Sequence, residues 1–401
     1  TFGLNRQSLQ TSSPRMGASQ ASGESQETKC TTSTKDARLR DQPGLAFFAE
    51  AFAAGEDETH LQRGCEPGVT MIELAANGLE DKGEAEWPLW KDAWNEDTSA
   101  ARGGALAFVP ADAGNASACI YFVHGGGFEY GGPAEDGYDS LCSRLAKGSG
   151  QIVVCPDHPL SGETRPFKAP EILQALLRGL RWLVRFDPVS KERRTSSPEI
   201  VLAGDSAGAT QAFSLLLLAL SEEEELKKCV AGLALVSPWL DLTCGSHTYV
   251  SNAFAAEANT GDLAFRAHAD ENRAGFKGMA LTYTGSADLL KDCLFSPYWL
   301  SREESNLLMR LQEWQIPTWI CTGASETLAG EVLDFAQQLQ NQIPLELWLH
   351  EGMFHDWVMY STDHPFPSKD AAMQQLFDFL RSIRAGTWKP KGIQYYIDPW
   401  K

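Results

Sequence analysis

The sequence predicts an α/β fold, in which strands of a central sheet lead into turns that carry the functional residues. Two apolar runs with the composition of buried strands, residues 118–123 and 200–203, each lead directly into a glycine-rich turn. Residues 207–220, after the second turn, are mostly Ala, Leu and Phe, which is the pattern of a buried helix. With 401 residues, the chain has room for one decorated α/β domain of about 300 residues and a cap, without a second core.

The turn at residues 204–208 reads GDSAG and matches the pattern G-x-S-x-G. In this motif a sharp strand-to-helix turn lifts a serine hydroxyl above the edge of the sheet, and the glycines leave room for the strained backbone. The pattern alone also describes a plain Gly-Ser turn, but the surrounding order of strand, turn and helix is the one the motif requires. Ser206 is therefore the candidate nucleophile.

The other turn, residues 124–128, reads HGGGF. The backbone amides of such a loop can point toward a ligand, and preorganised N–H donors stabilise the oxyanion that forms when an ester carbonyl is attacked. The candidate donors are the amides of Gly126, Gly127 and Ala207. A phosphate-binding loop is the alternative, but the tract matches neither G-x-G-x-x-G in a βαβ unit nor a Walker sequence.

A serine nucleophile needs a base, and the base needs an orienting carboxylate. Among the eight histidines, His355 has the position expected of the base, in the loop after the apolar run 345–349. Gly352 frees the backbone of this loop, and we expect Phe354 and Trp357 to shield the imidazole from water. His350 ends a strand and is more simply a structural or surface residue, and His124 belongs to the glycine loop. The other histidines lack a strand-end setting; they are His60, His158, His247, His268 and His364.

The candidate acid, Glu326, lies in the loop after the apolar run 317–321. A carboxylate there can accept the Nδ1–H of His355, which fixes the tautomer and stabilises the imidazolium that forms during attack. The alternative role of Glu326 is charge compensation at a helix N-terminus. Asp334 is the second candidate acid but falls within a predicted helix. Asp356 adjoins the histidine in sequence, and we expect its side chain to point elsewhere.

Together these motifs resemble the hormone-sensitive lipase family of α/β-hydrolases, also called family IV carboxylesterases. The resemblance covers roughly residues 104–385. It implies Ser206 as nucleophile, His355 as base, Glu326 as acid and an oxyanion hole at Gly126, Gly127 and Ala207. It further implies a mostly parallel eight-stranded sheet with helices on both faces, a helical N-terminal cap, and cleavage of uncharged carboxylic esters of short to medium acyl chain without metal or cofactor. The matching segments, in the order of the family, are 124–128, 204–208, 237–243, 296–297, 326–328 and 352–357.

The chain departs from the family pattern at two places. Residues 157–163 read DHPLSGE where the family usually has DYRLAPE, so the Tyr and Arg that brace this loop are missing. Glu326 stands where the family acid is more often Asp. The gibberellin-receptor branch of the family loses the catalytic histidine, whereas His355 is kept here. Two alternatives remain open: amide or lactone hydrolysis by the same triad, and a non-catalytic small-molecule receptor of the same fold.

The domain organisation follows from composition and from the resemblance. Residues 1–40 are rich in Ser, Thr and Gln, and we expect them to be disordered. They resemble either the remainder of a transit peptide or the end of a truncated chain. Trp87, Trp90 and Trp94 recur at helical spacing, which favours a packing stripe over substrate contact. The predicted parts are a cap region at 41–103, a catalytic domain at 104–386 with a second cap element at 251–285, and a C-terminal tail at 387–401.

Charge and cysteine content restrict the partners. The formal net charge of −19 disfavours nucleic acid and anionic membranes by repulsion. No apolar stretch reaches the ~18 residues that a membrane span requires. The nine cysteines are dispersed and form no C-x-x-C pair, which indicates a reducing compartment, either the cytoplasm or an organelle. The expected partner is a small-molecule ester substrate, and a homodimer is compatible with this interpretation.

Overall fold

A computed structural model describes the central part of the chain. The predicted disordered segment 1–40 lies outside the described residues, as do Trp87, Trp90 and Trp94. The described residues are 47–48, 50–51, 60–75, 104–113, 118–162, 167–222, 224–254, 261–265, 269–302, 306–361, 364 and 366–397.

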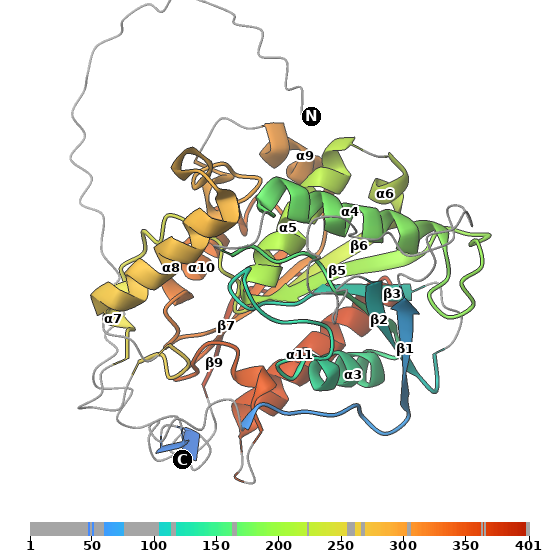
Figure 1. Cartoon of the computed structure of the whole chain (residues 1–401), viewed down its shortest axis with the longest axis horizontal. Coiled ribbons are helices and arrows are strands. Elements are labelled where there is room, and N and C mark those ends of the chain that lie inside the picture. The colour runs from blue at the N-terminus through green and yellow to red at the C-terminus, as the bar shows by residue number, and fades with distance from the viewer. Residues whose placement is uncertain are drawn as a thin grey trace, which may run out of the picture.

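A twisted sheet runs through the described part of the molecule (Figure 1). Its strand order is β1-β2-β4-β3-β5-β6-β7-β8-β9. β2 is antiparallel to both of its neighbours, and the strands from β4 to β9 are parallel to one another. The predicted α/β fold with a mostly parallel sheet is confirmed. The strands are β1 (Val69–Ala75), β2 (Gly104–Pro110), β3 (Ala118–Val123), β4 (Ile152–Pro156), β5 (Glu199–Asp205), β6 (Val230–Val236), β7 (Thr318–Gly323), β8 (Leu345–His350) and β9 (Gly392–Tyr396).

The sheet has nine strands in the described residues, and the predicted number of eight is wrong. β1 lies inside the region predicted as cap, and β9 lies inside the predicted C-terminal tail. Both are edge strands and are largely exposed or half-buried, so they lack the continuous apolar run that marks the central strands. Hydrophobicity alone therefore does not distinguish them from loop.

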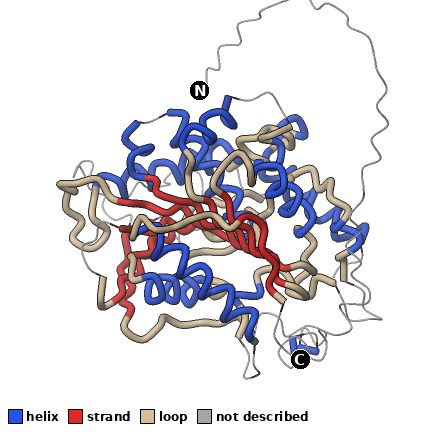
Figure 2. Tube along the Cα trace, turned by 180° about the vertical axis from the view of Figure 1, so that it is seen from behind, coloured by secondary structure: helices blue, strands red, loops and turns tan. Residues whose placement is uncertain are grey.

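Helices cover both faces of the sheet, as Figure 2 shows. One apolar core lies between the sheet and α4, α5, α9 and α10, and a second lies between the sheet and α3 and α11. The helices are α3 (Tyr138–Ser149), α4 (Ala169–Arg185), α5 (Ser206–Glu222), α6 (Glu224–Cys229), α7 (Thr248–Ser251), α8 (Ala269–Thr284), α9 (Asn306–Trp314), α10 (Ala329–Leu339) and α11 (Pro367–Arg384), with short 3₁₀ turns at Ala287–Leu289, Pro297–Trp299 and Trp357–Met359.

The parallel strands determine where the functional turns meet. The HGGGF turn follows β3, the GDSAG turn ends β5, the Glu326 turn follows β7 and the His355 loop follows β8. Because parallel strands end at the same edge of a sheet, four segments that are far apart in sequence converge there. In the segment predicted as a second cap element, α8 packs against α7 and α4.

Two further features bear on the sequence predictions. No helix in the described part of the chain is both long enough and apolar enough to cross a membrane. All cysteines within the described residues are free thiols, and those on β3, β4 and β7 are buried in the core.

The contact between the GDSAG turn and β3 predicts a large loss of stability on substitution. A Cβ atom on Gly208 would lie 2.2 Å from the carbonyl oxygen of Val123 and 2.4 Å from that of His124. Because both are backbone atoms, we expect Gly208→Ala to lower the free energy of unfolding by about 3 kcal/mol or more. Gly275 on α8 is the matched control, since a Cβ there meets nothing within 4 Å and Gly275→Ala should stabilise the helix by up to about 1 kcal/mol. Urea unfolding followed by circular dichroism measures both, and equal midpoints would contradict the described packing.

Candidate active site

Ser206 sits on a strained turn between β5 and α5. Its φ of +50° is in the left-handed region, which non-glycine residues rarely adopt. The turn is tight: a Cβ on Gly204 would lie 2.7 Å from the carbonyl carbon and oxygen of Gly208. The side chain of Ser206 is thereby held at the edge of the sheet where the other functional turns meet.

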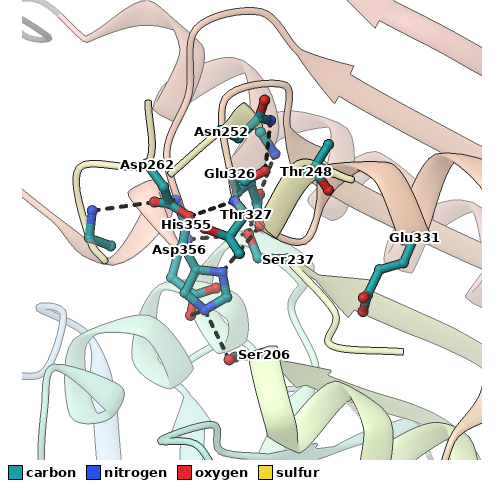
Figure 3. A network of polar contacts seen from close by, with 12 residues as sticks. Ser206, Ser237, Thr248, Asn252, Asp262, Glu326, Thr327, Glu331, His355 and Asp356 are labelled. Carbon is teal, nitrogen blue, oxygen red and sulfur yellow. Dashed lines mark hydrogen bonds and ion pairs between the residues drawn. The ribbon is translucent and has the colours of Figure 1, made fainter. Parts of the chain in front are cut away.

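Three side chains from three different turns form a hydrogen-bonded chain (Figure 3). Nε2 of His355 lies 2.9 Å from Oγ of Ser206, and Nδ1 of His355 lies 3.1 Å from Oε2 of Glu326. All three residues are buried. With Nδ1 protonated, the ring donates to Glu326 and presents the lone pair of Nε2 to the serine hydroxyl, which is the arrangement that removes a proton from serine.

Glu326 is held from both sides. Its Oε1 accepts hydrogen bonds from the hydroxyl of Ser237, at 2.8 Å, and from the amide of Gly323. Burial raises the pKa of the Glu326 carboxyl, and the hydrogen bond with His355 opposes this shift. Asp334, the second candidate acid, lies on α10, and its carboxylate binds the hydroxyl of Tyr298 and the guanidinium of Arg302.

Four non-glycine residues at this edge have left-handed backbone conformations. They are Phe128, Ser206, Ser237 and Asp356, with φ between +43° and +68°. Each such residue costs about 1–3 kcal/mol and persists only where surrounding contacts hold it, which is a common property of active sites. Their clustering is independent structural support for a functional site here.

The orientation of the Asp356 side chain differs from the prediction. Its side chain does not point away from His355, because Oδ2 lies 2.9 Å from Nε2 of that ring. The left-handed φ of +51° at Asp356 turns the carboxylate back toward the preceding residue. The amide of Asp356 also donates to Oγ of Ser237, at 3.2 Å.

The glycine loop after β3 has the geometry of an anion-binding turn. Gly126 and Gly127 have φ of +97° and +59°. A Cβ on Gly126 would lie 2.4 Å from the carbonyl oxygen of Tyr130, and one on Gly127 would lie 2.7 Å from Sδ of Met279. Within the described residues, the two glycine amides donate to no protein acceptor. The amide of Ala207 belongs to the first turn of α5, where helical amides have no intrahelical partner.

Asp205 links this loop to the nucleophile turn. Its carboxylate accepts hydrogen bonds from the amide of Gly125, at 3.0 Å, and from the hydroxyl of Tyr138, at 2.8 Å. The same tyrosine oxygen accepts from the Gly125 amide at 2.8 Å. Burial and the charge of Asp356 raise the pKa of Asp205 well above its ordinary value, against the hydrogen bond from Tyr138. The residue before Ser206 thus fixes the start of the glycine loop.

The loop that departs from the family pattern also packs on the glycine loop. The ring of His158 stacks on that of His124 with 4.2 Å between centroids, and burial lowers the pKa of His158 to about 4. The hydroxyl and amide of Ser161 both donate to the carbonyl oxygen of Phe128. A neutral stacked histidine and a serine therefore connect the 157–163 loop to the glycine loop.

A residue outside all the sequence motifs ties the base to the acid. Asp262 is fully buried, and its Oδ1 accepts from the amide of His355 at 3.0 Å while Oδ2 accepts from the amide of Thr327 at 2.7 Å. Nδ2 of Asn252 donates to the carbonyl oxygen of Glu326 at 2.9 Å. No local pattern marks Asp262, because its partners lie 65 and 93 positions away in the sequence.

The aromatic surroundings of the imidazole differ from the prediction. The ring against His355 is Phe265, with 4.7 Å between centroids. Phe354 instead packs on Phe48, and Trp357 packs on His350. Both side chains are fully buried in the apolar core between the sheet and α3 and α11, so they contribute to packing.

His350 is a buried structural histidine. Its ring nitrogens contact Oγ of Ser368 and Oε1 of Gln375, and burial lowers its pKa to about 4. The described residues contain no group of three or more His, Cys, Asp or Glu side chains arranged to hold a metal ion.

Proteins similar to this chain include several esterases. The chain is 25% identical to an esterase from Acinetobacter venetianus over 270 residues, which cover 67% of this chain and 76% of that protein. Its structure is similar to carboxyl esterase 2 of the mycorrhizal fungus Tuber melanosporum, with a TM-score of 0.63 and 18% identity, covering 85% of this chain and 99% of that one. It is also similar to an esterase of the bacterial hormone-sensitive lipase family, with a TM-score of 0.56 and 18% identity, covering 84% and 90%.

A match to a protein-family model shows which family the chain belongs to. The model described as the alpha/beta hydrolase fold matches residues 120–359, which is more than half of the chain. The matched range includes the HGGGF loop, the GDSAG turn and the loops of Glu326 and His355. This chain belongs to the α/β-hydrolase fold family.

Proposed function

We propose that the protein hydrolyses carboxylic esters, with Ser206 as nucleophile, His355 as general base and Glu326 as the acid that orients it. The observation that carries this proposal is the continuous hydrogen-bonded chain from Oγ of Ser206 through His355 to Oε2 of Glu326. The similar proteins that are called esterases support the same chemistry.

The geometry supports the following sequence of steps. Nε2 of His355 takes the hydroxyl proton of Ser206 as the oxygen attacks the ester carbonyl, and the amides of Gly126, Gly127 and Ala207 receive the oxyanion. The imidazolium then donates its proton to the leaving alcohol, and an acyl-enzyme remains on Ser206. Water hydrolyses this intermediate by the same route, which returns the serine hydroxyl and releases the carboxylic acid.

The surroundings favour uncharged substrates. The carboxylates of Glu326 and Asp356 contact the two ring nitrogens of His355, and that of Asp262 contacts its backbone amide, so an anionic ester would be repelled. On the apolar side, Phe265 covers His355 and the thioether of Met279 lies against Gly127. Because these two side chains come so close to the reacting groups, we propose acyl chains of short to medium length.

A matched substrate panel tests this proposal. We expect hydrolysis of p-nitrophenyl acetate and butyrate with kcat/KM values well above those for the palmitate ester and for the corresponding p-nitroanilides. The p-nitrophenyl esters are favoured over the p-nitroanilides because p-nitrophenolate departs without prior protonation, whereas p-nitroaniline does not. Faster turnover of the anilides would instead make the protein an amidase. Tight binding of an ester without turnover would make it a receptor.

A further inference from the structure

The catalytic histidine has two neighbours at one nitrogen. Oδ2 of Asp356 and Oγ of Ser206 each lie 2.9 Å from Nε2 of His355. The side chain of Asp356 is 13% exposed, and within the described residues its Oδ1 is buried with no hydrogen-bond partner. The backbone of Asp356, left-handed and bonded through its amide to Ser237, holds the side chain in this place.

This contact is favourable in only one protonation state of the ring. An ionised carboxylate accepts hydrogen bonds and donates none. A neutral His355 that donates from Nδ1 to Glu326 has only a lone pair at Nε2, which would face the lone pairs of Asp356. A protonated ring instead donates from Nδ1 to Glu326 and from Nε2 to Asp356, so both of its N–H groups meet a carboxylate. The geometry is that of an imidazolium between two carboxylates.

We propose that Asp356 is a second carboxylate partner of the catalytic base, which holds His355 protonated at Nε2 in the resting enzyme and so sets the pH at which Ser206 is activated. Asp356 is a positioning residue in this account, because it acts on the reaction through the imidazole. The inference rests on the proposed ester hydrolysis for its kinetic consequence, but the contact itself is independent of the substrate.

The other charged groups around the ring act in the same direction. Glu326 approaches from the turn after β7 and Asp262 from the segment before α8. Asp205, at the end of β5, also interacts with the ring, but burial and the charge of Asp356 raise its own pKa. The remaining face is covered by the uncharged ring of Phe265. Burial by itself lowers the pKa of His355, but the charge and hydrogen bond of Asp356, followed by those of Glu326, outweigh it and place this pKa well above its ordinary value.

The protonation states of His355 show how Asp356 affects the reaction. Below the pKa of His355, Nε2 already carries a proton and cannot accept the one on Ser206. When the pH rises through this pKa, that proton passes to solvent and the lone pair of Nε2 becomes available. During attack the serine proton moves to Nε2, and Asp356 stabilises the new imidazolium until the proton passes to the leaving alcohol. Asp356 therefore raises the reactivity of the deprotonated enzyme and reduces its population at neutral pH.

Asp356→Asn removes the charge and keeps the shape. The acid limb of the pH profile of kcat/KM reports the ionisation of the free enzyme, so it should move to lower pH by about 1–3 pH units. The plateau at high pH should fall, because the base is weaker. The variant should therefore be faster than wild type at low pH and slower at high pH, so that the two profiles cross. A residue that only supports the fold would lower the whole profile without moving its limb.

A second variant of Asp356 and a control at Asp136 complete the comparison. Asp356→Gly also accepts the left-handed backbone and removes the carboxylate, so it should shift the limb in the same direction. Asp136→Asn makes the same chemical change at an exposed residue with φ of +49°, and its profile should match wild type. Superimposable limbs for wild type and both Asp356 variants would overturn the proposal.

A measurement without substrate separates this inference from the proposed function. The titration of the His355 ring, followed by NMR and assigned by its absence in His355→Gln, should occur in the wild type well above the ordinary histidine value of about 6.5. It should move to lower pH in Asp356→Asn and Asp356→Gly. A wild-type titration at or below the ordinary value would overturn the role of Asp356. Loss of ester hydrolysis with the titration as expected would contradict only the proposed function.

Discussion

Ser206→Ala is expected to reduce kcat for short p-nitrophenyl esters by about five to six orders of magnitude. Removal of Oγ leaves no atom to form the acyl-enzyme, and the neighbouring imidazole at 2.9 Å has no proton to remove. The residual rate should come only from binding and from the amides of the glycine loop. Steady-state assays on purified protein, with active-site titration of the wild type, measure this loss.

The fold of Ser206→Ala should be retained. The variant removes one oxygen atom and leaves the contacts of Gly204 and Gly208 unchanged. The matched control is Ser190→Ala, an exposed serine in the turn after α4, which should keep wild-type kinetics. Hydrolysis by Ser206→Ala at more than a small fraction of the wild-type rate would remove Ser206 as nucleophile.

Glu326→Gln is expected to have the second largest effect, with a loss of about three to four orders of magnitude in kcat. Gln has the size of Glu but carries no charge to stabilise the imidazolium, and its amide nitrogen cannot accept the Nδ1–H of His355. Asp334→Asn should retain most of the activity, because the Asp334 carboxylate binds Tyr298, in the 3₁₀ turn Pro297–Trp299, and Arg302 just after that turn, and not His355. The plateau value of kcat, taken from the pH profile of each variant, decides between the two acids. A larger loss at Asp334 would overturn the choice of Glu326.

The central part of the fold follows from the sequence because the parallel strands are continuous apolar runs. Residues 118–123 and 200–203 were recognisable as strands, and the GDSAG and HGGGF motifs located the turns after them. The edge strands β1 and β9 were not recognisable, because each has one side without a neighbouring strand and retains polar or exposed residues. Their place in the sheet depends on pairing with β2 and β8, which is a long-range contact.

The same distinction applies to the candidate site. Ser206, His355 and Glu326 follow strands whose order is readable from the chain, and the structure brings the three together. Asp262 and the orientation of Asp356 were not predictable, since one depends on contacts with residues distant in sequence and the other on a single backbone angle. Local patterns thus predict which turns carry the chemistry, whereas the residues that hold those turns in place are determined by tertiary structure.

The most direct test of the account is the covalent reaction of the protein with a fluorophosphonate, followed by mass spectrometry of its peptides. The account predicts rapid, stoichiometric labelling of Ser206, with almost no labelling in Ser206→Ala and much slower labelling in His355→Gln. Labelling at another residue, or a rate that does not depend on His355, would contradict the proposed relay from Ser206 to His355.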